Sequence, residues 1–430
     1  MKKPMLQLLY NAATLLAYGL LKPIRGERHV ILKNFVSQKV LDFIDGRLRK
    51  SDYQNLREQT AGKRVVWFHC ASLGEYAVAR PLMKRLREED GMFVVLTFFS
   101  STGYNALHNK SADRNCADII LLLPIDTHHN ARRFVSAVNP ERAVFIISEI
   151  WVNHLAELRR RQIPTYLVSA IIRDSSVFFR WYGGLHRKAL STFRHITVLN
   201  DESRSNLQRL GYNDVTVCGD PLFDNALAIA GAEYHNDIIE NFCQQAPGGV
   251  FIAGSIHDEQ DLELVAAIAN RHPEQRCIFV PHEISSKSLN RIRAVLQGRT
   301  LAYSECCMQT DLSQVQVLII DFIGSLSRMY RFCRLAYVGG GFTPFLHSVI
   351  EATVYGLPVA FGPCIHRKVT PQQLMQHGIG QLVRTPDDLD EWYTSLVTAD
   401  GTLKQMHDKA LEYSSQNSGA VEAILKIIRS

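Results

Sequence analysis

Residues 69 to 75 read His-Cys-Ala-Ser-Leu-Gly-Glu, and this stretch decides how the first half of the chain folds. It follows an apolar run, Val65 to Phe68, and precedes an amphipathic stretch, Ala77 to Glu88. The pattern predicts a buried strand, a tight turn at residues 72–74, and a helix. Glu75 is then expected in the first helical turn, at the carboxyl edge of a parallel sheet, where open α/β folds bind ligands.

Two roles suit a carboxylate at this position. Glu75 can cap the helix, because acidic side chains stabilise helix N-termini. It can also act as a general base that takes a proton from a hydroxyl nucleophile. Gly74 beside it is expected to let the backbone turn or approach a ligand closely. Position alone leaves both roles of Glu75 open.

The composition limits the kinds of protein that this chain can be. The chain has 430 residues, of which 46% are apolar and 21% charged, which is typical of globular proteins. This length suits two domains of about 200 residues each. The net charge of +6 fits anionic substrates or an anionic membrane surface, and the scattered basic residues indicate no nucleic-acid partner. Nine cysteines without a C-x-x-C pair indicate a reducing, cytoplasmic location and no zinc site.

An apolar segment lies near the N-terminus. From Met5 to Leu21, 13 of 17 residues are apolar and none is charged, and basic residues flank the run on both sides. The run is slightly short for a membrane span, which needs about 20 residues. A signal peptide and a helix docked on the protein itself are the alternatives. We expect residues 1–50 to hold an uncleaved anchor or a membrane-lying helix whose basic residues face anionic lipid.

Short apolar strands alternate with helical patterns along both halves of the chain, which predicts parallel sheets covered by helices on both faces. A polar stretch, about residues 230–249, interrupts this alternation, so we place a domain boundary near residue 235. The predicted fold class is α/β, with two doubly wound, Rossmann-like domains, residues 51–235 and 236–430, facing each other across a cleft. The predicted strands are Val65 to Cys70, Phe93 to Phe98, Ile119 to Leu123, Ala143 to Ile147, Thr165 to Val168, Ile196 to Leu199, Val215 to Cys218, Val250 to Ala253, Cys277 to Val280, Val317 to Ile320, Ala336 to Val338 and Val359 to Phe361.

Polar residues follow three more predicted strands of the first domain. Ser101 and Thr102 can bind a sugar or a carboxylate, although Ser101 also suits a helix cap. Glu149 puts a second carboxylate at the same sheet edge as Glu75, where it can bind sugar hydroxyls, orient the base or pair with an arginine. Arg173 is the candidate partner, and it can equally clamp a phosphate or carboxylate of the substrate.

Loops of the second domain have the composition of a phosphate or nucleotide site. Turns between a strand and a helix bind phosphate, and glycines 339–341 can let a nucleotide approach the backbone, although they form no G-x-G-x-x-G motif. His347 and Glu351 are four residues apart, so a shared helix face is predicted, with His347 suited to a phosphate and Glu351 to a ribose diol. No third ligand accompanies them, which argues against a metal site. The candidate residues are Gly254, Ser255, His257, Pro281, His282, Asp321, Ile323, Gly324, Gly340, Gly341, His347, Ser348 and Glu351.

The ordered set of these motifs resembles the Kdo transferases of lipopolysaccharide assembly, which move 3-deoxy-D-manno-octulosonic acid (Kdo) from CMP-Kdo to a lipid A precursor. The resemblance covers nearly the whole chain, and the N-terminal apolar segment looks like that family's membrane anchor. The matching segments are His69 to Glu75, Ser100 to Gly103, Leu123 to Thr127, Ser148 to Trp151, Ala253 to His257, Asp321 to Gly324, Gly339 to Gly341, His347 to Glu351, Gly356 to Val359, and Gly362 with Pro363.

The resemblance implies an inverting, metal-independent GT-B glycosyltransferase with no cofactor, at the cytoplasmic face of the cell inner membrane and in contact with membrane lipids. Glu75 aligns with the family's general base and Glu149 with a second acidic residue of its active site. The first domain would hold the lipid A precursor (lipid IVA), and the loops of the second domain would hold CMP-Kdo. The candidate acceptor and sugar-binding residues are Ser72, Gly74, Ser101, Thr102 and Arg173.

The chain also departs from the family's pattern. Leu222 and Ser348 stand where many members have a cation and an asparagine, and residues 281–283 read Pro-His-Glu instead of Arg-His-Pro. Two alternatives therefore stay open. One is another GT-B enzyme that uses a UDP-sugar, such as a UDP-GlcNAc 2-epimerase, although a soluble epimerase would not need the segment from Met5 to Leu21. The other is an inactive, membrane-associated scaffold of the same fold.

Overall fold

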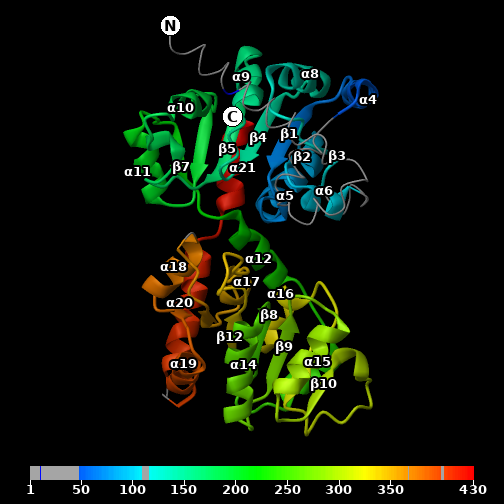
Figure 1. Ribbon diagram of the computed structural model, residues 1–430, viewed down its shortest axis with the longest axis vertical. Coiled ribbons are helices and arrows are strands. Elements are labelled where there is room, and N and C mark those ends of the chain that lie inside the picture. Colours follow the sequence, from blue (N-terminus) through cyan, green and yellow to red (C-terminus); the bar gives the residue numbers. More distant parts are fainter. Residues whose placement is uncertain (1–9, 11–47, 109–115, 367, 399–400) are drawn as a thin grey trace, which may run out of the picture. The chain divides into compact units, whose positions relative to one another are not determined.

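A computed structural model describes residue 10 and residues 48–108, 116–366, 368–398 and 401–430 (Figure 1). The chain forms two compact units. The first comprises Met1–Pro221 and Gly419–Ser430, and the second comprises Leu222–Ser418. Apart from Tyr10, the segment predicted to contact the membrane lies outside the described residues. Within the described part of the chain, no helix is long and apolar enough to cross a membrane.

The first unit is built on a seven-stranded parallel sheet with the strand order β3-β2-β1-β4-β5-β6-β7. The central strand β1 pairs with β2 (Val65 with Phe93) and with β4 (Val66 with Arg142), and all six of its residues are buried. Burial on both faces explains why this strand reads as a continuous apolar run. The strands are β1 (Val65–Cys70), β2 (Phe93–Phe98), β3 (Ile119–Leu122), β4 (Arg142–Ile146), β5 (Thr165–Ala170), β6 (His195–Val198) and β7 (Val215–Val217).

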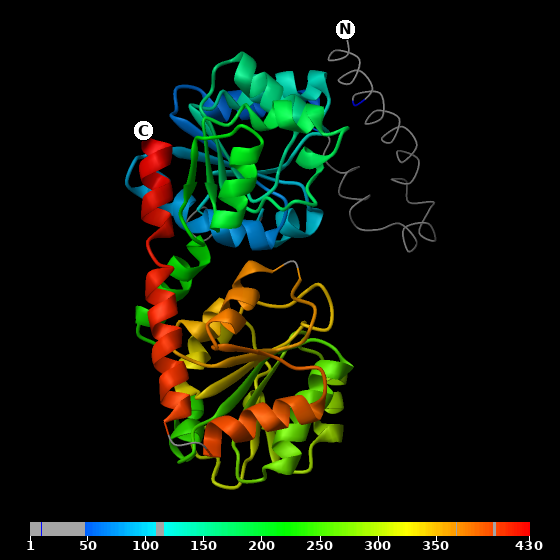
Figure 2. The ribbon, with the colours of Figure 1, turned by 90° about the vertical axis from the view of Figure 1, so that its left-hand side faces the viewer.

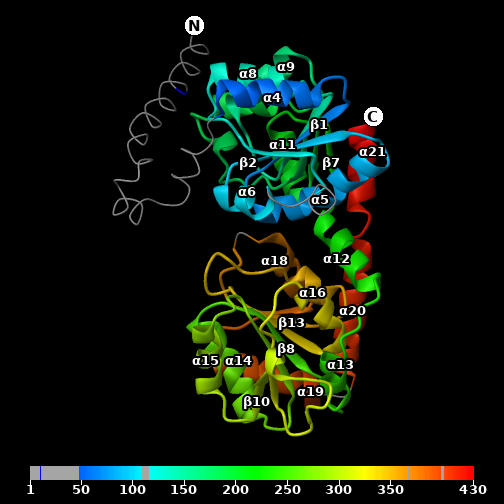
Figure 3. The same ribbon diagram turned by 90° about the vertical axis from the view of Figure 1, so that its right-hand side faces the viewer.

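Helices cover both faces of this sheet, as right-handed crossovers on either side of β1 require (Figure 3). One face carries α5 and α6, and the other carries α8 and α9, with α4 packed against α8. The last helix, α21, packs against α5 (Figure 3). The helices are α4 (Lys50–Thr60), α5 (Leu73–Glu88), α6 (Ser101–Leu107), α8 (His128–Val138), α9 (Val152–Arg160), η3 (Val177–Phe179), α10 (Gly184–Leu190), α11 (Asp201–Arg209) and α21 (Ala420–Arg429).

The second unit repeats this plan, with a seven-stranded parallel sheet in the order β10-β11-β9-β8-β12-β13-β14. Its two faces form separate apolar clusters, one with α14 and α19 and the other with α13, α17 and α20. The strands are β8 (Phe251–Ile256), β9 (Cys277–Pro281), β10 (Thr300–Ala302), β11 (Val317–Ile319), β12 (Leu335–Val338), β13 (Val359–Phe361) and β14 (Gly380–Leu382). The helices are α12 (Pro221–Gly231), α13 (Asp237–Gln244), α14 (Glu259–Arg271), α15 (Ser286–Val295), η4 (Tyr303–Glu305), α16 (Leu326–Met329), η5 (Tyr330–Phe332), α17 (Ile350–Thr353), α18 (Val369–Gln376), α19 (Pro386–Thr398) and α20 (Thr402–Gln416).

Two doubly wound α/β sheets confirm the predicted fold class, but the units divide the chain differently from the predicted boundary near residue 235. The second unit already begins at Leu222, because α12 contributes Phe223 and Ala226 to its apolar core. The chain also returns to the first unit at Gly419 (Figure 2). There the Arg142 guanidinium donates a hydrogen bond to the backbone oxygen of Ile428, at 2.6 Å.

Candidate active site

The turn from β1 into α5 holds Glu75 as predicted. Ser72 is the N-cap of α5, and its hydroxyl accepts a hydrogen bond from the Glu75 backbone N–H at 3.5 Å. The Glu75 carboxylate reaches back and accepts one from the Ala71 backbone N–H at 2.5 Å. This reciprocal arrangement resembles a capping box, so Glu75 does contribute to the cap.

A capping role alone does not account for the protonation of Glu75. Burial, followed by the charge of Glu149, raises its pKa to about 8, although the Ala71 N–H acts in the opposite direction. A carboxylate that only capped an exposed helix would instead be favoured in its charged form. With a pKa near neutral, Glu75 is suited to take a proton from a hydroxyl group in the transition state.

Gly74 is not required by the turn, contrary to our expectation. It lies within α5, and it is not among the glycines with a left-handed backbone. A Cβ atom at this position would meet only the Ser72 hydroxyl, at an ordinary 3.7 Å. The fold therefore leaves close approach of a ligand as the remaining reason for a glycine here, and that role stays a prediction.

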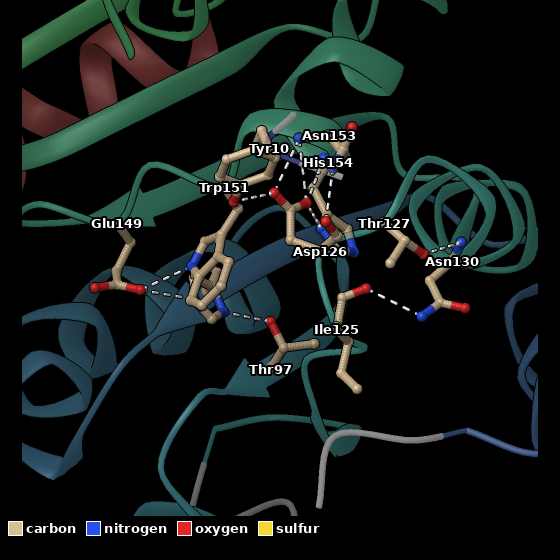
Figure 4. A network of polar contacts seen from close by, with 11 residues as sticks. Tyr10, Thr97, Ile125, Asp126, Thr127, Asn130, Glu149, Trp151, Asn153 and His154 are labelled. Carbon is tan, nitrogen blue, oxygen red and sulfur yellow. Dashed lines mark hydrogen bonds and ion pairs between the residues drawn. The ribbon is translucent and has the colours of Figure 1, made fainter. Parts of the chain in front are cut away.

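Glu149 follows β4 and is held by two side chains of the first unit (Figure 4). The Trp151 indole N–H donates to its Oε2 at 2.8 Å, and Nε2 of His69 lies 3.1 Å from the same oxygen. His69 is fully buried in β1, and its Nδ1 lies 2.9 Å from the hydroxyl of Thr97. These contacts fix the position of the Glu149 carboxylate, whose charge acts on Glu75.

Asp126 supports this region and was assigned no role from the sequence, although it lies in a segment that matches the family (Figure 4). Its buried carboxylate accepts hydrogen bonds from the backbone N–H groups of Asn153 and His154, at the start of α9, and it pairs with the His154 ring at 2.7 Å. Tyr10 donates a further bond at 2.9 Å. Burial disfavours the charged form, but these donors outweigh it and lower the pKa of Asp126. Asp126 thus fixes α9 directly after Glu149.

The other acceptor candidates lie at the ends of β2 and β5. Ser101 is buried in the first turn of α6, whereas Thr102 is exposed. Ser100, not Ser101, occupies the N-cap of α6, so the capping alternative for Ser101 is wrong. Arg173 follows β5, and its backbone N–H donates to the Ser176 hydroxyl at 3.1 Å.

Strained backbone marks the carboxyl ends of several strands. Ile147, Ser169 and Ser255 have φ angles of 61°, 56° and 56°, in the left-handed region that a β-branched residue such as isoleucine rarely adopts. Ile147 lies directly before Ser148 and Glu149, and Ser255 lies within β8 two residues before His257. Such residues cluster at functional sites, where the surrounding structure maintains the strain. Their positions support the candidate residues at both sheet edges.

Three histidines gather at the carboxyl edge of the second sheet. The ring of His282 lies 4.9 Å from that of His257 and 4.7 Å from that of His347, measured between centroids. The Nδ1 atom of His257 and the Nε2 atom of His347 are buried without a hydrogen-bond partner in the described structure. Burial, then His282, His257 and Lys368, lower the pKa of His347 to about 4. A bound anion would supply both the missing acceptor and the missing negative charge.

Asp261 connects the loops of this edge, and sequence reasoning missed it. Its buried carboxylate accepts hydrogen bonds from the Tyr337 hydroxyl at 2.6 Å, from the Gly340 N–H at 2.8 Å and from the His257 N–H at 2.9 Å. Burial raises the pKa of Asp261, although these three donors act in the opposite direction. The spacing of Asp258 and Asp261, which matches a capping box, could have drawn attention to it.

The glycines at 339–341 serve packing between loops, and the approach of a nucleotide to the backbone there stays a prediction. A Cβ atom at Gly339 would lie 2.2 Å from the Ser255 oxygen, and one at Gly341 would lie 2.5 Å from the Gly362 nitrogen. Gly340 has a φ of +83° and would collide with the Phe345 oxygen. Gly254 is similarly close to the Tyr330 hydroxyl. These positions need glycine without any ligand.

The remaining donor candidates are partly rearranged. His347 precedes α17, which begins at Ile350, so His347 and Glu351 share no helix face, contrary to the prediction. Burial raises the pKa of Glu351 to about 7. Asp321 accepts a hydrogen bond from the Ser304 N–H at 3.0 Å and so fixes η4. The other candidates at this edge are Pro281, the last residue of β9, the half-buried Ser348, the exposed Gly324 with its φ of +98°, and Ile323, which is 89% exposed.

The departures from the family's pattern have structural explanations in part. Leu222 packs against the apolar core of the second unit, where a cation would be out of place. Nothing in the described contacts explains Ser348. Among the residues that the structure describes, no three His, Cys, Asp or Glu side chains are grouped as the ligands of a metal ion would be.

Solved structures with the same architecture define the class of fold. UDP-GlcNAc 2-epimerase from Neisseria meningitidis matches with a TM-score of 0.59 at 14% identity and covers 85% of this chain and 100% of that chain. A glycosyltransferase from Rickettsia africae matches with a TM-score of 0.56 at 11% identity and covers 85% and 98%. At these identities the likeness shows the fold alone, which is that of GT-B glycosyltransferases and UDP-GlcNAc 2-epimerases.

Sequence relatives narrow the class. The family described as 3-deoxy-D-manno-octulosonic-acid transferase (kdotransferase) matches residues 46–225. The 3-deoxy-D-manno-octulosonic acid transferase of Bordetella pertussis is 28% identical over 375 residues, which cover 84% of this chain and 86% of that protein. The enzyme of the same name from Aquifex aeolicus is 26% identical and covers 80% and 88%. Residues 46–225 therefore match the Kdo transferase family, and most of the chain is similar to Kdo transferases at 26–28% identity, which supports a glycosyltransferase.

Proposed function

We propose that this protein transfers Kdo from CMP-Kdo to a lipid A precursor, lipid IVA, with inversion at the anomeric carbon. Glu75 carries the proposal, because its pKa of about 8 suits a general base and it lies in the part of the chain that matches the Kdo transferase family. The carboxylate takes the proton of an acceptor hydroxyl. The hydroxyl oxygen then bonds to the anomeric carbon of Kdo while the bond to the CMP phosphate breaks, and CMP leaves with the electron pair.

Glu149 is proposed to keep Glu75 basic. Its negative charge favours the protonated form of Glu75 and so strengthens Glu75 as a proton acceptor. The contacts with His69 and Trp151 hold the Glu149 carboxylate in place. Neither of these residues is an arginine, which would neutralise its charge. Ser72, Gly74, Ser101, Thr102 and Arg173 are proposed to contact the acceptor or its sugar.

The second unit is proposed to bind the CMP phosphate at the three histidines, where two buried ring nitrogens have no hydrogen-bond partner among the described residues. Glu351 is proposed to bind the ribose diol, and the loops fixed by Asp261 position the histidine cluster. We propose that transfer needs no metal ion. One phosphate carries less negative charge than the diphosphate of a UDP-sugar, so a divalent cation is less necessary. The protein is proposed to act at the cytoplasmic face of the inner membrane, with residues 5–21 in contact with lipid.

The test is an assay of the detergent-purified protein with CMP-Kdo and a tetra-acylated lipid A precursor, with and without EDTA. We expect the same amount of product in both samples and a rate about 10³-fold lower from Glu75→Gln. Product that disappears with EDTA would overturn metal independence. If no product forms, equilibrium binding of CMP against UDP decides: UDP binding would favour a UDP-sugar enzyme, and CMP binding without turnover would favour the scaffold alternative.

A further inference from the structure

The first unit has a groove lined by apolar side chains and cations, and exposed aromatic rings lie just before one of the two helices that form it. The groove lies between α9 and α10, which contact each other (Figure 1). The groove has a volume of about 470 Å³. Apolar side chains of Val152, Ala156, Leu185 and Ala189 line it, together with Thr192 and the cations Arg159, Arg160 and Lys188. We call this surface, with Trp181 and Tyr182 of the preceding turn, the α9–α10 face.

The aromatic residues of this face are exposed without a folding reason. Trp181 is 92% exposed and Tyr182 is 52% exposed, and their rings meet edge to face at 5.5 Å. Large aromatic side chains dominate cores because their burial is favourable, so a nearly fully exposed tryptophan indicates contact with something else. Trp and Tyr together are enriched where a protein meets the headgroup region of a membrane.

The positive charge of this face indicates that its binding partner is negatively charged. Of the eight residues that line the groove, three are cations (Arg159, Arg160 and Lys188) and none is acidic. On α9 the one carboxylate, Glu157, already pairs with both Arg160 and Arg161, at 2.7 Å each. The sequence of α10 contains no acidic residue. A cationic rim around an apolar floor is complementary to anionic headgroups above acyl chains.

Tyr10 contacts the first unit near the start of α9. Tyr10 lies within the apolar run from Met5 to Leu21, and its hydroxyl bonds to Asp126. Asp126 in turn accepts from the backbone of Asn153, next to Val152 of the groove. Tyr10, which belongs to a run whose composition suits a membrane, is therefore linked through Asp126 to the same helix, α9.

We propose that the α9–α10 face docks on the surface of an anionic phospholipid bilayer, with Trp181 and Tyr182 inserted at headgroup depth. Arg159, Arg160 and Lys188 contact lipid phosphates there. This docking is separate from contact through the N-terminal segment, and it does not depend on the chemistry of Glu75. It would set the orientation of the first unit on the bilayer.

Fluorescence quenching of the full-length protein by brominated lipid tests the proposal. Trp67 and Trp392 are buried and Trp151 is partly buried, so Trp181 is the most accessible of the four tryptophans. Vesicles of about 30% phosphatidylglycerol in brominated phosphatidylcholine should quench and blue-shift its emission. Trp181→Phe should remove the quenched component. Because the readout is local, membrane contact by the N-terminal segment alone does not produce it.

Charge variants distinguish docking by this face from non-specific attraction between the cationic protein and anionic lipid. Arg159→Glu/Lys188→Glu should lower vesicle partitioning about tenfold or more, since each basic residue near an anionic surface contributes roughly fivefold. Lys404→Glu/Lys409→Glu, on exposed positions of α20, makes the same change in net charge and should leave partitioning and quenching nearly unaltered.

Three results would overturn the proposal. The first is an unquenched Trp181 in protein that sediments with the vesicles, which would assign binding to another surface. The second is equal quenching by vesicles of phosphatidylcholine alone. The third is quenching that appears only when a phosphorylated glycolipid acceptor is added, which would make the face an acceptor site and not a bilayer-docking site.

Discussion

The two units share one fold but place opposite chemistry at the carboxyl ends of their strands. In the first unit, two carboxylates lie at the sheet edge, and burial together with the charge of Glu149 raises the pKa of Glu75. In the second unit, three histidines and Lys368 lie at the corresponding edge, and burial with mutual repulsion lowers the pKa of His347. An acidic edge suits a proton acceptor and a basic edge suits an anion, so the roles proposed for the two units rest on their charge patterns and not on their shared fold.

The supporting residues follow the same division. Asp126 and Asp261 are both buried carboxylates that accept hydrogen bonds from backbone N–H groups of neighbouring loops. Asp126 fixes the helix that follows Glu149, and Asp261 fixes the loops around His257 and Gly340. Each edge therefore depends on one buried carboxylate that is not expected to touch substrate.

The largest expected effect concerns the acidic edge. Glu75→Gln should lower kcat by about 10³-fold, because general-base catalysis typically contributes 10²- to 10⁴-fold. CMP binding should stay unchanged, since the nucleotide is proposed to bind the other unit. Steady-state kinetics and calorimetry measure the two quantities. Glu88→Gln, an exposed position of the same helix, is the matched control. Near-normal turnover of Glu75→Gln would show that Glu75 is not the general base.

The next largest effect concerns Asp261. Asp261→Asn should lower the free energy of unfolding by about 2 kcal/mol, because an amide cannot accept all three hydrogen bonds and leaves a buried donor unsatisfied. The affinity for CMP should fall with it, as the loop with His257 loosens. Denaturant titration and nucleotide binding are the measurements, with the exposed Glu259→Gln as the control. Unchanged CMP affinity would show that Asp261 supports the fold only.

At the basic edge, His347→Ala should weaken CMP binding about tenfold, which corresponds to about 1.4 kcal/mol for a lost charge-assisted contact. A phosphate favours the protonated form of the histidines, so wild-type CMP binding should take up protons and strengthen as the pH falls. Calorimetry in buffers of different ionisation enthalpy measures this uptake. The exposed His235→Ala serves as the control. If proton uptake persists unchanged in His347→Ala, a group other than His347 takes up the proton.

A smaller effect is expected at Gly74. Gly74→Ala should raise the free energy of unfolding by about 0.5 to 1 kcal/mol, because the position is helical and has room for a Cβ atom. Turnover with the lipid acceptor should nevertheless fall severalfold if the backbone is approached closely there. Thermal unfolding and acceptor kinetics separate the two effects. A variant that is both more stable and fully active would show that Gly74 does not contact the acceptor.

The smallest expected effect is on stability. The folded-state pKa of Glu75, about 8, lies above the unfolded value of about 4.3. Its contribution to stability is therefore fully present below pH 4 and is lost as the pH rises towards 8. The melting temperature of Glu75→Gln relative to wild type should rise by about 2 °C or more between pH 5 and pH 9. A constant difference would show that the pKa of Glu75 is not raised.

The sequence predicted the strands of both sheets well where they are apolar runs. It missed β10 (Thr300–Ala302) and β14 (Gly380–Leu382), which are short strands at sheet edges and only partly buried, so they lack a continuous apolar run. It also could not show that α21 belongs to the first unit. That placement depends on contacts such as Arg429 with Asp90, which are distant in sequence.

The candidate site shows a similar limit. Glu75 and Glu149 could be found because each follows an apolar strand at a predictable sheet edge. From its spacing with Asp258, Asp261 could be predicted only as part of a helix cap, because its three partners come from segments that only the fold brings together. The four-residue spacing of His347 and Glu351 predicted a shared helix face that does not exist, since α17 is a single turn that begins after His347.

The pH dependence of kcat/KM for the lipid acceptor, measured with CMP-Kdo saturating, tests the central claim most directly. If Glu75 is the base, kcat/KM should rise with pH and level off near pH 8, where the carboxylate becomes ionised. The residual activity of Glu75→Gln should lack this rise. A wild-type profile that is flat from pH 6 to 9, or that keeps its rise in Glu75→Gln, would contradict the assignment of the acidic edge.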